Sequence, residues 1–428
     1  MKKLLFFLLI LLSLKIKAQK LSAEEKRIVD LITTQMPETI QLLEQLVNIN
    51  SGTLNVEGVK KTGAILRKEF DKIGFTTEWI SLPDSLKRAG HLVAHTKGTK
   101  RKKLFLIGHL DTVFEPDMEP NPYKKLNDST ATGQGVNDMK GGDMIIFAAL
   151  KALNDLGLLK NTSITAYFTG DEEKAGRPTS ISRADFIERA KRSDIALGFE
   201  GAQGLHIVAT ARRGSSEWKL SVTGKQGHSS GVFSSGYGSI YEASRILNTF
   251  REELSKEKYL TFNPGIFIGG SEVDYDTVNI KGRVSGKTNI ISPISFVQGD
   301  LRFLTEAQKN AARERMRKIT TTNNLKGTSA KISFADGYPA MEPTAGNDSL
   351  VQILNKVSTN MGIGFTKAGD PGSRGAGDIS FVAKYIDCLD GLGADGDGAH
   401  EPGETINLKQ FPILIQRAAI FIYRLTRE

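Results

Sequence analysis

The sequence predicts an α/β protein whose mostly parallel sheet is flanked by helices and interrupted by a smaller inserted α+β unit. Two observations lead to this fold class. Strand-like apolar runs alternate with amphipathic helical segments up to about residue 211 and again after about residue 347, which is typical of a helix-covered parallel sheet. Between them, residues 216–334 contain the order strand, helix, strand, strand, helix, strand, with one further strand-like run before the second helix, which predicts a ferredoxin-like insertion.

The first part begins with apolar residues at helical spacing over 21–47, and Pro37 within this stretch predicts two helices rather than one. A further helix is expected over 57–73, ended by Gly74. The remaining expected elements are strands 76–81, 91–95, 103–107, 163–168 and 195–199 and helices 138–156 and 182–191.

The inserted part is expected to contain strands 216–222, 262–269, 277–283, 296–304 and 330–334 and helices 239–254 and 305–319. After the insertion the α/β pattern resumes. It comprises helices 349–361, 378–384 and 408–425 and strand 386–389, which adds to the first sheet. We therefore predict a catalytic domain in two parts, residues 19–211 and 336–428, around an inserted domain of residues 212–335.

The N-terminus has the pattern of a secretory signal peptide over residues 1–18. Met1-Lys2-Lys3 supplies a basic start, the apolar run 4–14 is too short to span a bilayer comfortably, and Ala18 offers a small residue for cleavage. Cleavage is favoured over an uncleaved anchor. We expect an exported protein, periplasmic or secreted, with no stable membrane span.

Composition excludes some functions. Hydrophobic residues make up 39% and charged residues 25% of the 428 residues, as in ordinary globular proteins. The net charge is +9, and four of the lysines lie in the leader; no basic stripe with interleaved aromatics suggests a nucleic-acid partner. Cys388 is the single cysteine, so no intrachain disulfide can form, and its apolar neighbours predict a core position.

Three consecutive acids follow a strand-like apolar run. Asp171, Glu172 and Glu173 follow residues 163–168 after Thr169 and Gly170, and they would repel one another unless a cation or several donors neutralised them. An adjacent Glu-Glu pair can also divide two tasks, because one carboxylate can bind a metal while the other transfers protons. Alone, the cluster is equally typical of a solvated loop.

Further metal-ligand residue types occupy equivalent places. His109 and Asp111 end a strand, Glu200 follows another strand, Asp138 opens a helix, and His400 lies in a Gly-rich loop. Each alone is typical of a cap or an exposed loop. Together with Glu173 they would meet at the carboxyl ends of the strands, where two histidines and three carboxylates suit a pair of divalent cations.

These residues carry a family resemblance. The relevant segments are His109-x-Asp111, Gly135-Val136-Asn137-Asp138-Met139-Lys140-Gly141-Gly142, Asp171-Glu172-Glu173, Glu200 and His400. Their order and content resemble the co-catalytic zinc exopeptidases, the family of carboxypeptidase G (glutamate carboxypeptidase), the aminoacylases and succinyl-diaminopimelate desuccinylase. The match extends over nearly the whole chain after the leader.

The resemblance implies two Zn²⁺ ions, although the ligand types also admit other divalent ions such as iron or manganese. His109 and Glu200 would bind one ion, Glu173 and His400 the other, and Asp138 both. It also implies that the Asp138–Met139 peptide is cis.

Two further roles near the ions are expected. The resemblance implies that Glu172 is the general base. Asp111, two residues after His109 in an extended chain, is placed on the same side to orient His109 through its second ring nitrogen.

Residues of the insertion also match. His228, in Gly224-Lys225-Gln226-Gly227-His228-Ser229-Ser230, resembles the lid histidine that stabilises the oxyanion, often in the partner subunit's active site. Asn289 and Arg302 resemble lid residues that bind the substrate carboxylate, and Arg374 is a further candidate. The resemblance thus implies a homodimer formed through the lid.

The implied function is hydrolysis of the C-terminal amide bond of a peptide or an N-acyl amino acid. Glutamate-releasing relatives are expected to have a basic residue where this chain has Tyr338, so glutamate specificity is in doubt. The alternatives are an aminoacylase or dipeptidase with the same metals, or a non-catalytic binding protein. A protein that only binds would be expected to lack Glu172 or a metal ligand, and all are present.

Overall fold

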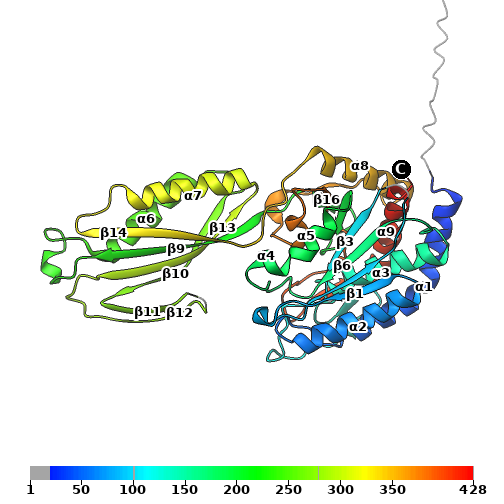
Figure 1. Ribbon diagram of the computed structural model, residues 1–428, viewed down its shortest axis with the longest axis horizontal. Helices are drawn as coiled ribbons and strands as arrows, with labels where there is room; N and C mark the ends of the chain where they lie inside the picture. Colours follow the sequence, from blue (N-terminus) through cyan, green and yellow to red (C-terminus); the bar gives the residue numbers. More distant parts are fainter. Residues whose placement is uncertain (1–19, 100–101, 278, 428) are drawn as a thin grey trace, which may run out of the picture.

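A six-stranded sheet organises the larger part of the chain (Figure 1). The computed structural model describes residues 20–99, 102–277 and 279–427, and the predicted signal peptide lies outside them. In spatial order the strands are β1 (Thr76–Ile80), β2 (His91–His95), β6 (Ile164–Thr169), β3 (Leu104–His109), β7 (Ile195–Gly198) and β16 (Asp387–Leu389).

The prediction of a mostly parallel sheet is confirmed for four neighbouring strands. β6, β3, β7 and β16 pair in parallel, whereas β2 is antiparallel to both β1 and β6. Leu104 of β3 pairs with Ile164 on one side and Ile195 on the other, so the parallel strands begin and end close to the same levels. Cys388 is buried in β16, as predicted.

Both faces of this sheet are covered. Leu104 and Leu106 of β3 belong to a large apolar cluster under the long helices, whereas Phe105 and Ile107 belong to a second cluster on the opposite face. This alternation follows from the two-residue repeat of an extended strand. The helices are α1 (Ala23–Val47), α2 (Val56–Lys72), α3 (Lys140–Asp155), α4 (Thr179–Ser182), α5 (Ala184–Ala190), α8 (Ala345–Asn360) and α9 (Phe411–Leu425).

The prediction that Pro37 divides the first helical segment is wrong. α1 is one helix of 25 residues with Pro37 inside it. Proline removes one hydrogen bond, to the carbonyl four residues earlier, but Ile28 and Ile32 before it and Leu43 after it lie in the same buried cluster. Burial on both sides of Pro37 therefore keeps the helix continuous. In contrast, α2 ends as predicted, and Gly74 after it has a φ of +78°.

Shorter predicted elements also differ. The helix expected over 182–191 is divided into α4 and α5, and the one expected over 378–384 is a 3₁₀ turn, Asp378–Phe381. Two small sheets add to the larger one. They comprise β4 (Lys124–Lys125), β5 (Thr130–Thr132) and β17 (Thr405–Asn407), and β8 (Ile207–Val208) with β15 (Lys367–Ala368).

The second part of the chain forms its own antiparallel sheet with two helices and a separate apolar cluster. Its spatial strand order is β10 (Thr261–Gly270), β13 (Ile294–Phe303), β9 (Gly214–Gly224) and β14 (Thr328–Asp336), with helices α6 (Gly238–Leu254) and α7 (Glu306–Thr321). We call residues 213–340 the inserted unit and the remaining described residues the body. Figure 1 shows the inserted unit projecting from one end of the body.

The strand predicted over 277–283 is wrong. The chain there turns between β11 (Glu272–Asp276) and β12 (Lys281–Ser285), which form a hairpin. Asp276 Oδ1 accepts a hydrogen bond from the Asn279 backbone N–H at 3.1 Å, and Ile280 has a φ of +53°. The acidic side chain thus stabilises a turn inside an otherwise strand-like sequence.

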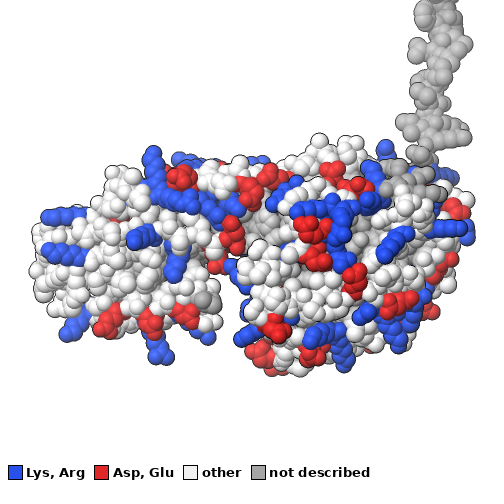
Figure 2. Space-filling model, in the orientation of Figure 1, with Lys and Arg blue, Asp and Glu red and all other residues white. Residues whose placement is uncertain are grey.

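Basic side chains attach α7 to the sheet of the inserted unit. Figure 2 shows lysine and arginine side chains gathered along this helix. Arg313 and Lys309 contact Asp336 of β14 at 2.6 and 3.2 Å, and Arg313 lies over the Phe334 ring, 5.2 Å from its centroid. Part of this charge therefore binds α7 to β14.

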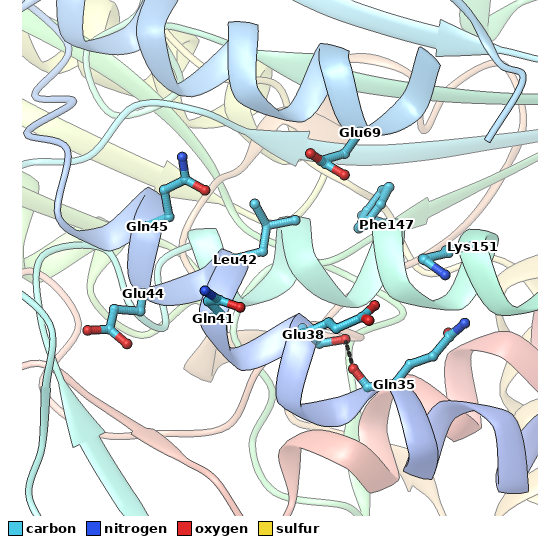
Figure 3. A pocket seen from close by; sticks show the side chains of 10 residues that line it. Gln35, Glu38, Gln41, Leu42, Glu44, Gln45, Glu69, Phe147 and Lys151 are labelled. Carbon is cyan, nitrogen blue, oxygen red and sulfur yellow. Dashed lines mark hydrogen bonds between the residues drawn. The ribbon is translucent and has the colours of Figure 1, made fainter. Parts of the chain in front are cut away.

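The body contains a surface hollow of about 530 Å³ between α1, α2 and α3 (Figure 3). Glu38 and Glu69 approach it from α1 and α2, and Phe147 and Lys151 from α3. None of its lining residues is a predicted site residue. Among the described helices, none combines the length and apolarity needed to cross a membrane.

Gly142 allows α3 to pack closely against the end of the sheet, because it has no Cβ. A Cβ at this position would lie 2.1 Å from the Phe199 carbonyl oxygen, so Gly142→Ala must move α3 away from the end of β7. We expect the free energy of unfolding to fall by about 1–3 kcal/mol in urea denaturation. The control is Gly265→Ala, whose added Cβ would meet no atom closer than 3.8 Å. Equal stability of both variants would contradict this account.

Candidate active site

Three parallel strands bring polar residues to one edge of the body sheet. β3 ends at His109, β6 is followed by Asp171-Glu172-Glu173, and Glu200 comes two residues after β7. His109 pairs with Thr169 in register, so the first two strands end at the same level. The carboxyl edge of such a sheet is the usual position of a ligand site.

Two loops add the remaining predicted ligands. Asp138 lies two residues before α3, and the Asp138–Met139 peptide is cis, as the resemblance implied. His400 has a φ of +69° in the loop before β17. Neither residue belongs to a strand of the six-stranded sheet. The loops before α3 and β17 bring them to its edge.

Asp138 lies between the two histidines. Its Oδ1 is 3.2 Å from His109 Nε2, and its Oδ2 is 3.2 Å from His400 Nε2. Glu200 Oε1 lies 3.7 Å from the same nitrogen of His109, and Glu173 Oε2 lies 3.2 Å from that of His400. The five residues thus form two groups of three that share one carboxylate.

This arrangement fits a pair of metal ions. In each group, one ligand atom per residue lies within 4.8 Å of the others. The donors are imidazole nitrogens and carboxylate oxygens, which suit zinc and related divalent ions. Glu173 Oε1 is buried and has no hydrogen-bond partner among the described residues, so it is free to coordinate. We call these five residues the metal cluster.

The carboxylates of the cluster have strongly perturbed pKa values. Burial, reinforced by the charge of Asp138, raises the pKa of Glu200 to about 7, and burial likewise raises the pKa of Glu173. Although burial opposes it, the pKa of Asp138 is lowered because His109 and His400 both hydrogen-bond to its carboxylate. Carboxylates packed this closely require positive charge between them.

Asp111 connects His109 to the acidic loop. His109 Nδ1 lies 3.0 Å from the Asp111 carbonyl oxygen and 3.5 Å from its Oδ1, so the backbone is the nearer partner. The carboxylate accepts hydrogen bonds from the backbone N–H groups of Glu172 and Glu173, at 2.9 and 3.1 Å, and from the Thr53 hydroxyl at 2.6 Å. Asp111 therefore holds the acidic loop with its carboxylate and contacts His109 chiefly with its backbone carbonyl.

Glu172, like Asp171, belongs to neither of the two metal groups. Burial raises its pKa well above that of an ordinary glutamate, and the charge of Glu200 adds to this shift. A carboxylate whose pKa is raised holds a proton more readily, which suits the exchange of protons with a substrate.

A buried ion network lies behind the loop. Arg183 is fully buried, forms an ion pair with Asp171, and donates to Asp378 Oδ1 at 2.8 Å. Asp378 Oδ2 also accepts a hydrogen bond from the Thr169 hydroxyl at 2.6 Å. Asp171 therefore neutralises a buried arginine. Its role is structural and differs from the roles expected for the neighbouring Glu172 and Glu173.

Arg374 is adjacent to the cluster. Its buried Nη2 has no hydrogen-bond partner among the described residues. Burial lowers the pKa of Arg374, and the charges that act on it include those of Asp390, Glu200 and Asp138. The structure thus places an unpaired guanidinium nitrogen beside the acidic residues.

The three predicted lid residues lie apart from the cluster. His228 and Asn289 are neighbours beyond the far end of β9, where Ser229 N–H donates to the Asn289 carbonyl at 2.9 Å. Arg302 pairs with Ser215 near the other end of β9 and contacts Asp300 at 2.6 Å. Across the described residues, no hydrogen bond or ion pair connects these three side chains to the cluster.

Sequence reasoning missed Glu404. This fully buried carboxylate accepts hydrogen bonds from the backbone N–H groups of Gly135, Asn137 and Asp138, at 3.1, 2.7 and 2.7 Å. It therefore fastens the Asp138 loop to the loop that contains His400. The sequence offered one signal for Glu404, which is that it lies four residues after His400. Its hydrogen-bond partners are backbone N–H groups, and the side-chain types of those residues do not reveal the contact.

Glu404→Gln should weaken metal binding about 10- to 100-fold, because an amide cannot accept all three hydrogen bonds that position Asp138. Competition between the protein and a chelator for zinc measures this affinity. Glu401→Gln is the control, since Glu401 is exposed in the same loop. Equal affinities in the two variants would contradict the role given to Glu404.

Known proteins are similar to this chain over most of its length. Carboxypeptidase G2 of Pseudomonas sp. (strain RS-16) is 28% identical over 394 residues, covering 91% of this chain and 90% of the relative. The succinyl-diaminopimelate desuccinylase of Pelagibacter ubique (strain HTCC1062) is 24% identical over 383 residues, covering 86% of this chain and 94% of the relative. The similarity therefore extends over both the body and the inserted unit.

Solved structures share the fold. Aminopeptidase PepT from Bacillus cereus superposes with a TM-score of 0.73 at 17% identity, covering 90% of this chain and 98% of that one. The M20 family metallo-carboxypeptidase Sso-CP2 from Sulfolobus solfataricus gives 0.65 at 18% identity, covering 91% and 100%. The model of peptidase family M20/M25/M40 matches residues 105–424. The chain is therefore a metallopeptidase-type amidohydrolase that belongs to peptidase family M20/M25/M40.

Proposed function

We propose that the protein is an exported two-zinc carboxypeptidase that hydrolyses the C-terminal amide bond of peptides or N-acyl amino acids. The observation that supports this most directly is Asp138, whose two oxygens each face a different histidine at 3.2 Å. His109 and Glu200 would bind one ion, and Glu173 and His400 the other, with Asp138 shared. When bound, the ions would supply Lewis acidity to the scissile carbonyl and to water.

Glu172 is the proposed general base. It would take a proton from the attacking water and transfer it to the leaving amine. Its position beside the cluster and its raised pKa support this role. Asp111 contributes by fixing the backbone of Glu172 and by contacting His109.

Arg374 is the proposed anchor for the substrate carboxylate within the same chain. Its free Nη2 and its proximity to acidic residues that metals would neutralise support this role. A guanidinium can bind a carboxylate through two hydrogen bonds, which would also orient the scissile bond. Asn289 and Arg302 remain proposed contributors from the inserted unit.

His228 is proposed to stabilise the oxyanion from a partner subunit. The eleven residues of β9 separate its two ends by roughly 30 Å. His228 lies beyond the end of β9 that is remote from the body. We therefore propose a homodimer in which the inserted unit of each chain completes the site of the other.

The nearest alternative is an aminoacylase or dipeptidase that uses the same cluster. Relatives of this chain include both carboxypeptidase G2 and an acetylornithine deacetylase, the latter of Pasteurella multocida (strain Pm70). A less favoured alternative is a metal-binding homologue without catalysis. Zinc is proposed as the native metal, and iron or manganese would have to be tested beside it.

A substrate panel tests the proposed function. Metal-loaded protein should hydrolyse C-terminal amides of dipeptides or N-acyl amino acids, and removal of metal by a chelator should abolish this activity. Glu172→Gln should reduce kcat about 100- to 10,000-fold while metal stays bound. Preference for short acyl groups would favour the aminoacylase alternative. Absence of turnover with metal bound would contradict the proposal.

Arg374→Gln should raise KM about 10- to 100-fold for substrates with a free C-terminal carboxylate, because one charge-assisted contact is lost. C-terminally amidated substrates should show no such change. Arg302→Gln is the comparison, since Arg302 already contacts Asp300. A larger rise of KM in Arg302→Gln than in Arg374→Gln would place the carboxylate anchor in the inserted unit.

A further inference from the structure

Tyr338 lies where the chain returns from the inserted unit to the body. Its backbone N–H donates to the Ser215 hydroxyl at 3.2 Å, and its carbonyl accepts from the Ser215 backbone N–H at 2.8 Å. Its ring packs against Phe381 of the body, with centroids 5.0 Å apart. This residue therefore contacts the beginning of β9 and the body at the same time.

The phenol reaches the acidic loop. Tyr338 donates a hydrogen bond from its hydroxyl to the Glu172 carbonyl oxygen at 2.6 Å. On the other side of the same peptide group, the Glu173 N–H donates to Asp111 Oδ2 at 3.1 Å. The peptide that joins Glu172 to Glu173 is thus bound on both sides, and its orientation is fixed.

Arg183 orients this phenol. Its Nη2 lies 3.5 Å from the Tyr338 oxygen and donates to the Asp171 carbonyl at 3.1 Å. A guanidinium only donates hydrogen bonds, so the phenol oxygen accepts on that side and its proton points toward Glu172. Burial raises the pKa of Tyr338 well above its ordinary value, so the hydroxyl keeps this proton.

We infer that Tyr338 is a positioning residue for catalysis, which fixes the peptide between the general base and a metal ligand and connects it to the inserted unit. This inference rests on the proposed role of Glu172. It gives Tyr338 a part of its own at the position where glutamate-releasing relatives are expected to have a basic residue, because its hydroxyl is bound to backbone. A change in the path of residues 336–341 would then be transmitted to the orientation of Glu172.

The test is Tyr338→Phe, which removes the hydroxyl and keeps the ring against Phe381. We expect kcat to fall about three- to tenfold, the effect of losing one neutral hydrogen bond, with KM changed less than twofold. Bound metal and Tm should match the unmodified protein. Tyr167→Phe is the matched control, because this buried tyrosine donates to Asp185 at 3.2 Å and not to the acidic loop.

The outcomes separate this inference from the proposed function. If Glu172→Gln is inactive and Tyr338→Phe keeps the kcat of the unmodified protein, only the positioning role is overturned. If Tyr338→Phe loses metal or Tm in proportion to activity, the residue is structural and the inference fails. If Glu172→Gln retains activity, the proposed function fails, and the inference fails with it.

Discussion

The close packing of carboxylates at the sheet edge is the constraint on which the rest of this site depends. Glu200 lies beside His109 and Glu173 beside His400, and both histidines also contact Asp138. Burial raises the pKa of both glutamates. Such a group is stable only when positive charge lies between its members. The surrounding residues accordingly fix backbone and imidazole groups and leave the carboxylate oxygens available.

Two buried acids perform this fixing. Asp111 binds the N–H groups of Glu172 and Glu173, and Glu404 binds those around Asp138. Each carboxylate thus uses main-chain donors to hold a loop that contains a metal-ligand candidate. Hydrogen bonds from backbone N–H groups to a carboxylate are among the stronger ones in proteins. Here they hold segments of chain that lie outside helices and strands.

The sequence predicts the parts of the site that follow from strand periodicity. His109, Glu173 and Glu200 follow apolar runs, and a parallel sheet must bring such strand ends together. Asp138 and His400 lie in loops, so strand periodicity does not place them, and their assignment to particular ions came from the family resemblance. Glu404 and Tyr338 bind backbone groups far away in the chain, and no pattern of residue types encodes such partners.

The errors in the fold have a similar origin. Locally, Pro37 favours a break in the helix, but burial of α1 residues on both sides of Pro37 keeps the helix continuous. The run over 277–283 has strand-like composition, yet Asp276 forms a turn with the backbone of Asn279. Local preferences therefore failed where burial or one side-chain contact outweighed them.

The two connections to the inserted unit lie side by side on the body. Arg212 and Met341 exchange both backbone hydrogen bonds, at 2.9 and 3.0 Å, so the chain leaves and re-enters the body at adjacent points. A two-residue turn could close the body at this place without moving a strand of its sheet. The inserted unit could therefore be excised at this place in a shortened protein that keeps every strand of the body sheet.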